Sequence, residues 1–573
     1  MLFSHFFCIV TSSKYLGNRN WSNNNSLHSM RKISILNLLT VILFSCSQKS
    51  PADLIIYNAN IYTVDSAFSS KEAMAIKDGK IIATGSSAEI KKEFEAKEST
   101  DANGKFIYPG FIDAHAHFIG FTGYAMSLQN INLFGTKSWD EVIVRVKDFA
   151  KTHPEGWLKG RGWDQNDWAI KEFPTKQILD SIFPDRPILL TRVDGHAAIA
   201  NQKALDIASV KSGTTINGGK LELKNGKLTG LLIDNAIGIV RSKIPAITDE
   251  ELLKVVIQAQ RDCFAVGLTT IDDCGLDFAE IEKIEKFQQS GDLKMRIYAM
   301  LSDDPANFEY IFKRGKIKTD RLNVRSFKVY ADGALGSRGA SLLAPYSDKP
   351  GWSGFLLSSA SHFDSVANII YNKGYQMCTH AIGDSGNRTI LNIYAKYLKG
   401  KNDLRWRIEH AQVVNSNDFA LFGANSIIPS VQPTHATSDM YWAGDRLGAE
   451  RVKGAYAYQQ LLKENGWLPL GTDFPVEDIS PFKTFYAAVI RKDAKGFPDN
   501  GYQMENALSR EDALRGMTIW AAKSNFEEHE KGSLEKGKFA DFIILDQDIM
   551  KIEGNKILQT KVLGTYLNGV KEF

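Results

Sequence analysis

The chain has 573 residues, enough for more than one domain, because domains usually span about 100–200 residues. Its 43% hydrophobic and 24% charged residues are typical of a globular protein and exclude a disordered or fibrous chain. The formal net charge of +3 is small for this length and gives no support for a nucleic-acid partner.

The first predicted element is an apolar leader. Residues 30–46 begin Met-Arg-Lys, continue through a short apolar run and end Leu-Phe-Ser-Cys, which is the order of a secretory signal peptide. Cys46 stands where a bacterial lipobox places the lipidated cysteine. We therefore expect an exported cell-envelope lipoprotein whose only membrane contact is a lipid anchor at Cys46, with simple secretion as the alternative. Residues 1–29 are expected to be an over-long gene start ahead of Met30.

Short β-rich runs separated by turn residues lie at both ends of the remaining chain. They span residues 53–65, 73–83, 538–546 and 561–570. This shared texture predicts one small β-sandwich domain built from both chain ends, residues 47–107 and 530–573.

Between the two ends, apolar β-rich runs alternate with helical patterns, which indicates βαβ units and a parallel sheet. The eight candidate strands are residues 106–117, 268–273, 295–301, 324–332, 375–380, 407–410, 426–432 and 467–473. They predict an α/β fold, a (β/α)8 TIM barrel over residues 108–529. The gap after the first strand is too long for one crossover, so residues from about 124 to 241 are predicted to form an inserted subdomain.

Polar side chains gather at the carboxyl ends of these strands, where TIM barrels place their functional residues. Four histidines and an aspartate lie there: His115, His117, His380, His410 and Asp473. Alternation along the first strand puts its two histidines on one face, so both imidazoles can reach one metal ion. Nitrogen and oxygen donors of this kind suit zinc or another first-row divalent ion.

A lysine, Lys328, lies inside the apolar fourth strand, where it is costly unless it is paired or modified. Each of these signals has an ordinary explanation by itself. A lone histidine is more often a core residue than a ligand, and a lysine can extend its amine to a barrel end. Their joint occurrence at the ends of five strands favours a metal site.

Several motifs resemble the amidohydrolase superfamily. Residues 108–117, Tyr-Pro-Gly-Phe-Ile-Asp-Ala-His-Ala-His, resemble its strand-one signature, and residues 532–546 resemble the segment that returns to the terminal β domain. Motifs similar to the amidohydrolase family 3 group, which includes N-substituted formamide deformylases, span residues 160–164, 194–196, 331–338 and 432–435. The resemblance covers nearly the whole chain after the leader and implies a metal-dependent hydrolase.

The resemblance also implies roles for individual residues. His115, His117 and Asp473 would bind a first divalent ion, His380 and His410 a second, and carboxylated Lys328 would bridge both. We expect both ions to be Zn²⁺, and Asp473 to be catalytic as the group that moves the proton of a metal-held hydroxide. Substrate contacts are expected from Trp163, Asp164, His196, Arg338 and His435.

The expected reaction is hydrolysis of a non-peptide C–N bond, in an amide or formamide of a small molecule, by metal-bound hydroxide. A deaminase of the same fold is an alternative, although the glutamate that such enzymes carry three residues after the strand-five histidine is here Gly383. An esterase or lactonase, a non-catalytic envelope lipoprotein and a homodimeric assembly stay open.

Overall fold

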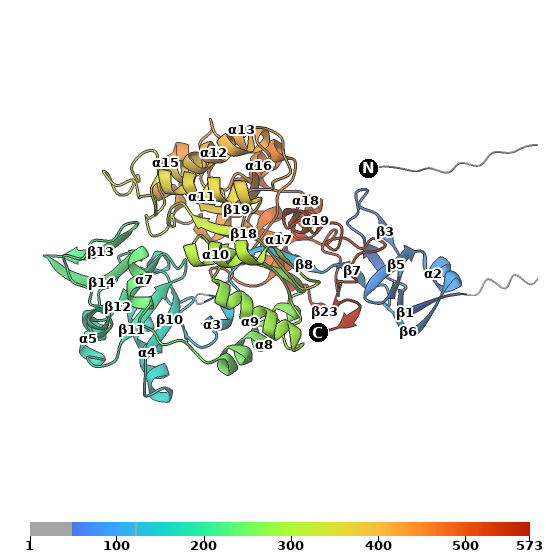
Figure 1. Ribbon diagram of the computed structural model, residues 1–573, viewed down its shortest axis with the longest axis horizontal. Helices are drawn as coiled ribbons and strands as arrows, with labels where there is room; N and C mark the ends of the chain where they lie inside the picture. The colour runs from blue at the N-terminus through green and yellow to red at the C-terminus, as the bar shows by residue number, and fades with distance from the viewer. Residues whose placement is uncertain (1–48, 121–122) are drawn as a thin grey trace, which may run out of the picture. The chain divides into compact units, whose positions relative to one another are not determined.

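The computed structural model describes residues 49–120 and 123–573 (Figure 1), and the predicted leader with Cys46 lies outside these ranges. Within them, no helix combines the length and the apolar character that crossing a membrane requires.

A sheet of parallel strands forms the centre of the fold (Figure 1), with the spatial order β21-β20-β19-β18-β16-β15-β8. These strands are β8 (Phe111–Ala116), β15 (Leu268–Leu276), β16 (Arg296–Ser302), β18 (Leu322–Tyr330), β19 (Gln376–Ala381), β20 (Arg407–His410) and β21 (Ile428–Ser430). A two-residue strand, β17 (Ile317–Lys318), pairs with β18 in the antiparallel sense.

The eighth predicted strand, residues 467–473, is irregular but closes this sheet. Leu470 forms a single parallel bridge with Val431, and its carbonyl accepts a hydrogen bond from the Ala114 N–H. The Asp473 N–H donates to the His115 carbonyl. Asp473 has φ 65°, outside the range of an extended strand, so the segment cannot continue as a regular strand. The result is the predicted (β/α)8 TIM barrel.

Helices follow the barrel strands and cover them (Figure 1). They include α8 (Asp249–Ala265), α9 (Phe278–Gln289), α10 (Pro305–Arg314), α11 (Ala360–Lys373), α12 (Asp384–Leu398), α13 (Phe419–Ala424), α14 (Pro433–Asp439), α15 (Ala443–Arg451), α16 (Tyr458–Asn465), α17 (Pro481–Ile490), α18 (Arg510–Gly516) and α19 (Ile519–Ser524). In α8, Thr248 and Glu251 form a capping box, and Leu252, Val256 and Ala259 bury one face against the barrel.

The first predicted strand, residues 106–117, is two strands and not one. Strand β7 (Phe106–Pro109) pairs with β22 (Phe542–Leu545) in a sheet built from both chain ends, whereas β8 belongs to the barrel. The chain changes sheets at Gly110, where a Cβ atom would overlap the side chain of Thr269. An apolar run with uniform β character does not reveal such a change of sheet.

Strands from both chain ends form two further sheets. One contains β1 (Ser50–Tyr57), β4 (Ala73–Lys77), β5 (Lys80–Gly85) and β6 (Phe94–Asp101), with α2 (Ser87–Glu93) against it. The other contains β7, β22, β2 (Asn60–Tyr62), β3 (Ser70–Lys71), β23 (Val562–Leu567) and β24 (Val570–Lys571). Ile56 and Ile76 of the first sheet share one apolar core with Ile107 and Phe542 of the second.

Residues between β8 and α8 form a separate six-stranded sheet with its own helices (Figure 1). We call it the insert sheet. Its strands are β9 (Ile131–Asn132), β10 (Leu158–Trp163), β11 (Ile188–Arg192), β12 (Ala197–Ala200), β13 (Gly219–Lys224) and β14 (Lys227–Asp234). Its helices are α4 (Trp139–Thr152), α5 (Gln177–Ile182), α6 (Gln202–Ile207) and α7 (Asn235–Arg241), and the short α3 (Tyr124–Ser127) precedes it.

Candidate active site

Two histidines at the end of β8 point their Nε2 atoms at the same carboxylate. The Nδ1 atom of His115 lies 2.6 Å from Oε2 of Glu409, and that of His117 lies 3.0 Å from the Cys274 carbonyl oxygen. Because their Nδ1 atoms are engaged, their Nε2 atoms face Oδ1 of Asp473, at 3.6 Å and 3.4 Å.

These distances suit a bound metal ion. Ligand atoms about 2.0–2.2 Å from a tetrahedral zinc ion lie about 3.4 Å from each other. Three buried atoms, Asp473 Oδ1, His380 Nε2 and His410 Nδ1, have no hydrogen-bond partner within residues 49–120 and 123–573. Unpartnered buried polar atoms cost free energy, and a divalent ion would give them a partner. The residues present therefore fit a metal centre.

The histidines at the ends of β19 and β20 complete the cluster. The His410 ring centroid lies 4.6 Å from that of His380 and 4.7 Å from that of His115. Burial lowers the pKa of His380 and His410 well below the usual histidine value, and burial with the nearby Lys328 charge lowers that of His115 to about 4. The rings are therefore neutral near pH 7, the state in which imidazole binds metal.

Lys328 is fully buried on β18 and lies against this cluster. Its Nζ atom is 3.2 Å from His115 Nε2 and 5.1 Å from the centre of the Tyr330 ring. It forms no ion pair with a carboxylate of the described ranges. A buried ammonium group without a counter-ion is costly, and it would also repel metal ions. The structure thus brings together all six predicted ligands: His115, His117, Lys328, His380, His410 and Asp473.

Two neighbours of the ligands were missed by the sequence analysis. Glu409 binds His115 on one side and lies 2.6 Å from Arg407 Nε on the other. Although burial favours the neutral acid, the charge of Arg407 and the hydrogen bond to His115 hold the pKa of Glu409 well below its usual range. Two opposite charges at alternate positions of one buried strand, β20, were the signal that could have revealed this pair.

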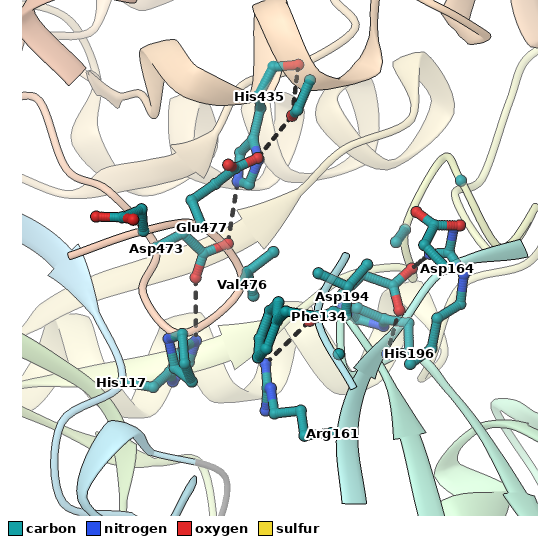
Figure 2. A pocket seen from close by; sticks show the side chains of 18 of the residues that line it. His117, Phe134, Arg161, Asp164, Asp194, His196, His435, Asp473, Val476 and Glu477 are labelled. Atoms are coloured by element: carbon teal, nitrogen blue, oxygen red, sulfur yellow. Dashed lines mark hydrogen bonds and ion pairs between the residues drawn. The ribbon is translucent and has the colours of Figure 1, made fainter. Parts of the chain in front are cut away.

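A cavity of about 670 Å³ opens over the cluster. Figure 2 shows Asp473, His117 and His435 on one side and Asp164, Asp194 and His196 on the other. The second group belongs to the insert sheet and its loops. The cavity is therefore shared between the barrel, which supplies the predicted ligands, and the insert, which supplies the facing wall.

Three of the five predicted substrate contacts line this cavity, namely Asp164, His196 and His435. Trp163 does not, because its ring is buried in the insert core and its Nε1–H donates to the Leu190 carbonyl at 2.8 Å. A bulge at Gly162, with φ 112°, breaks the strand alternation and leaves Arg161 on the cavity side. Trp163 therefore lies outside the cavity, and its role as a substrate contact stays a prediction.

Arg338 also lies away from the cavity. Its Nη2 atom donates to Asp348 at 2.8 Å, and it lines a separate hollow of about 510 Å³. The turn after β18 is held by Asp332, whose carboxylate accepts hydrogen bonds from the backbone N–H groups of Ser341 and Gly383. Arg338 therefore also lies outside the cavity over the histidine cluster, and its substrate contact stays a prediction.

A third missed residue, Arg192, organises the insert wall. Its side chain is buried and pairs with both Asp164 and Asp194, and its Nε–H donates to Gln165 at 2.9 Å. A charged residue at the end of the apolar strand β11 was the available signal. Beside this group, the Nδ1 atom of His196 lies 2.6 Å from Oδ1 of Asp234.

His435 bridges two carboxylates on the barrel side (Figure 2). Its Nε2 lies 3.1 Å from Asp473 Oδ2, and its Nδ1 lies 3.3 Å from Glu477 Oε1. Burial opposes protonation, but the two carboxylates raise the pKa of His435 well above the usual value. Both ring nitrogens are thus engaged by protein groups.

Comparisons with known proteins fit this geometry. Residues 98–571 match the amidohydrolase family. The chain is 34% identical to Protein LONG AFTER FAR-RED 3 of Arabidopsis thaliana, over 90% of this chain and 91% of that protein. It is 25% identical to N-substituted formamide deformylase of Arthrobacter pascens, over 91% of this chain and 98% of that protein. The crystal structure of an uncharacterized metal-dependent hydrolase from Pyrococcus horikoshii OT3 aligns with a TM-score of 0.71 at 28% identity, covering 87% of this chain and 99% of that one.

Proposed function

The chain belongs to the amidohydrolase family, and we propose that it hydrolyses an amide or formamide C–N bond of a small molecule at a centre of two Zn²⁺ ions bridged by carboxylated Lys328. That it is a hydrolase acting on C–N bonds follows from the family and from the metal-dependent hydrolases that it resembles. The observation that carries the finer proposal is the approach of His115 and His117 Nε2 to the unpartnered Oδ1 of Asp473.

His115, His117 and Asp473 would hold one ion, and His380 and His410 the other. Bound divalent ions lower the pKa of water from about 15.7 towards about 7 and polarise a carbonyl group. Asp473 accepts a proton from the attacking water and delivers it to the leaving nitrogen. His435 holds the second oxygen of that carboxylate and so fixes its orientation.

The wall opposite the ligands orients the substrate in this proposal. Asp164 and Asp194 are held in place by Arg192, and His196 is held by Asp234. These side chains face the cavity from rigid strand ends, so they supply fixed polar contacts across from the reacting bond. The relative from Arthrobacter pascens is named for formamide deformylation, which makes N-substituted formamides the first substrates to test.

Deamination is less well supported. A Cβ atom at Gly383 would overlap the backbone carbonyl of Ser341, so this position has no room for the glutamate that deaminases of this fold carry there. The glycine is required by a close backbone approach and is not an incidental substitution.

The test is turnover by the zinc-loaded protein, with N-formyl amines, N-acetyl amines and their ester analogues as substrates. Amine release from the formyl or acetyl compounds, lost by about 10³-fold in Asp473→Asn, is the expected result. The control is Glu527→Gln, which makes the same kind of change at a buried carboxylate that pairs with Lys531. Ester cleavage without any amide cleavage would contradict the proposal.

A further inference from the structure

We propose that Glu409, held by Arg407, decides which ring nitrogen of His115 carries the proton and thereby keeps Nε2 available as a metal ligand. Glu409 is in this sense a positioning residue for the metal centre. The inference rests on the metal site of the proposed function, but it concerns a property of the protein that can also be measured without metal.

Arg407 holds the Glu409 carboxylate in one orientation. Its Nε lies 2.6 Å from Oε1, and its Nη2 donates to Oε2 at 3.0 Å. The same guanidinium donates to Asp272 of β15 at 2.9 Å, to Ser430 of β21 at 2.8 Å and to the Ala114 carbonyl of β8. Both Glu409 and Arg407 are fully buried. Since the guanidinium is tied to three other barrel strands, the carboxylate cannot turn away.

The held carboxylate leaves His115 a single arrangement. Glu409 Oε2 lies 2.6 Å from Nδ1, and a carboxylate only accepts hydrogen bonds, so Nδ1 must carry the proton. On the other side of the ring, Lys328 Nζ lies 3.2 Å from Nε2, so Nε2 is on the side of the predicted ligands. The contact with Glu409 therefore specifies the tautomer, with the Nε2 lone pair facing those ligands.

His117 offers a contrast within the same site. Its Nδ1 lies 3.0 Å from the backbone carbonyl of Cys274, an acceptor that no side-chain substitution removes. The tautomer of His117 is thus set by the backbone, whereas that of His115 depends on one side chain. A change at Glu409 should affect His115 alone.

Glu409→Gln tests the tautomer because an amide offers one acceptor and one donor where the carboxylate offers two acceptors. Either orientation of the amide places its NH₂ group beside a nitrogen of Arg407, at 3.0 Å from Nη2 or at 2.6 Å from Nε. The shorter contact is the more costly, so we expect the oxygen at the Oε1 position and the NH₂ group facing His115 Nδ1, to which it donates. The ring proton then moves to Nε2 and the ligand lone pair is lost.

Arg407→Met combined with Glu409→Gln removes the restraint on the amide. The amide can then turn its oxygen towards His115 and restore the original tautomer. The double variant should therefore bind metal more tightly than Glu409→Gln alone, although it has lost a further buried charge. A purely structural role for Glu409 predicts the opposite order, since the second substitution would add to the damage.

The experiment measures the Zn²⁺ dissociation constant of the purified protein by competition with a chelator. We expect Glu409→Gln to weaken binding by roughly 10- to 100-fold, as changes behind a histidine ligand do, and the control Glu527→Gln to leave it unchanged. In parallel, the ¹⁵N spectrum of labelled histidine in metal-free wild type, with His115 assigned from His115→Asn, should show its proton on Nδ1.

Equal Zn²⁺ affinity of Glu409→Gln and wild type would overturn the inference, and so would a wild-type His115 protonated on Nε2. A wild type that binds no Zn²⁺ would instead contradict the proposed function. In that case the ¹⁵N measurement on the metal-free protein still decides the inference. The same ¹⁵N measurement decides the inference if Glu409→Gln fails to fold, because the measurement needs no variant at Glu409.

Discussion

The Nε2 atom of His435 lies 3.1 Å from Oδ2 of Asp473, while the other oxygen of that carboxylate faces the Nε2 atoms of His115 and His117. The two oxygens of Asp473 therefore have different surroundings. Oδ1 is directed to the predicted ligands, and Oδ2 is held by a ring that Glu477 fixes from behind. This division allows one carboxylate to bind metal and to keep a defined orientation towards the substrate.

His435→Asn should lower kcat by roughly 10- to 100-fold while the metal content stays that of the wild type. Asparagine is too short to reach Asp473 from α14, so Asp473 loses its orientation but keeps the oxygen that faces the ligands. Steady-state kinetics and elemental analysis of the same preparation check this. A wild-type kcat in His435→Asn would show that the contact has no role in turnover.

Lys328→Met should reduce the bound metal from about two ions to about one per chain, because the side chain that would bridge the ions is gone. Methionine keeps the buried volume and lacks the amine that carbon dioxide modifies. Wild type prepared without bicarbonate should also contain fewer than two metal ions per chain, although the decrease should be smaller. If Lys328→Met retains the full metal content, the lysine is not a bridging ligand.

His196→Asn should raise KM about tenfold at unchanged metal content, because His196 faces the cavity from the insert wall and is not a predicted ligand. The control for His196→Asn is Trp163→Phe, at a residue of the insert that does not line the cavity. This control removes the hydrogen bond to the Leu190 carbonyl, so it should lower the free energy of unfolding by about 1 kcal/mol and leave KM unchanged. A raised KM in Trp163→Phe would show that the tryptophan affects substrate binding.

Gly383→Ala should destabilise the fold by about 1–3 kcal/mol, since the added Cβ meets the Ser341 carbonyl in a closely packed turn. Denaturant unfolding of the variant and the wild type measures the difference. A neutral substitution would mean that the turn can move, and a deaminase-type glutamate would then be sterically possible at this position.

The predicted envelope location concerns residues outside the described ranges and is testable in cells. Expressed from Met30 in a bacterium that processes lipoproteins, the chain should incorporate labelled palmitate, and Cys46→Ala should abolish the label. Palmitate labelling that persists in Cys46→Ala would contradict the anchor at this cysteine. An exported but unlabelled wild type would favour simple secretion.

Alternation and strand ends were enough to predict the barrel and the clustering of the predicted ligand residues at one end of it. His115 and His117 share a face because they are two residues apart on one strand, and His380 and His410 end neighbouring parallel strands. These relationships depend only on period and topology. The motif resemblance then identified the family, which the match over residues 98–571 confirms.

What the sequence did not reveal depends on local backbone geometry. The bulge at Gly162 reverses the side on which Trp163 lies, and the change of sheet at Gly110 divides an apparently continuous strand. The pairing of His115 with Glu409 and of Arg192 with Asp164 joins residues whose separation along the chain gives no sign of contact. Periodicity describes one strand at a time and cannot supply such pairings.

The most direct test of the central claim is the number of metal ions per chain. The protein is expressed with zinc and bicarbonate, freed of loosely bound metal and analysed for its elements. We expect about two zinc ions per chain, shared among the six predicted ligands. A folded protein without tightly bound metal would contradict it, and a value near one would contradict the carboxylated Lys328 bridge.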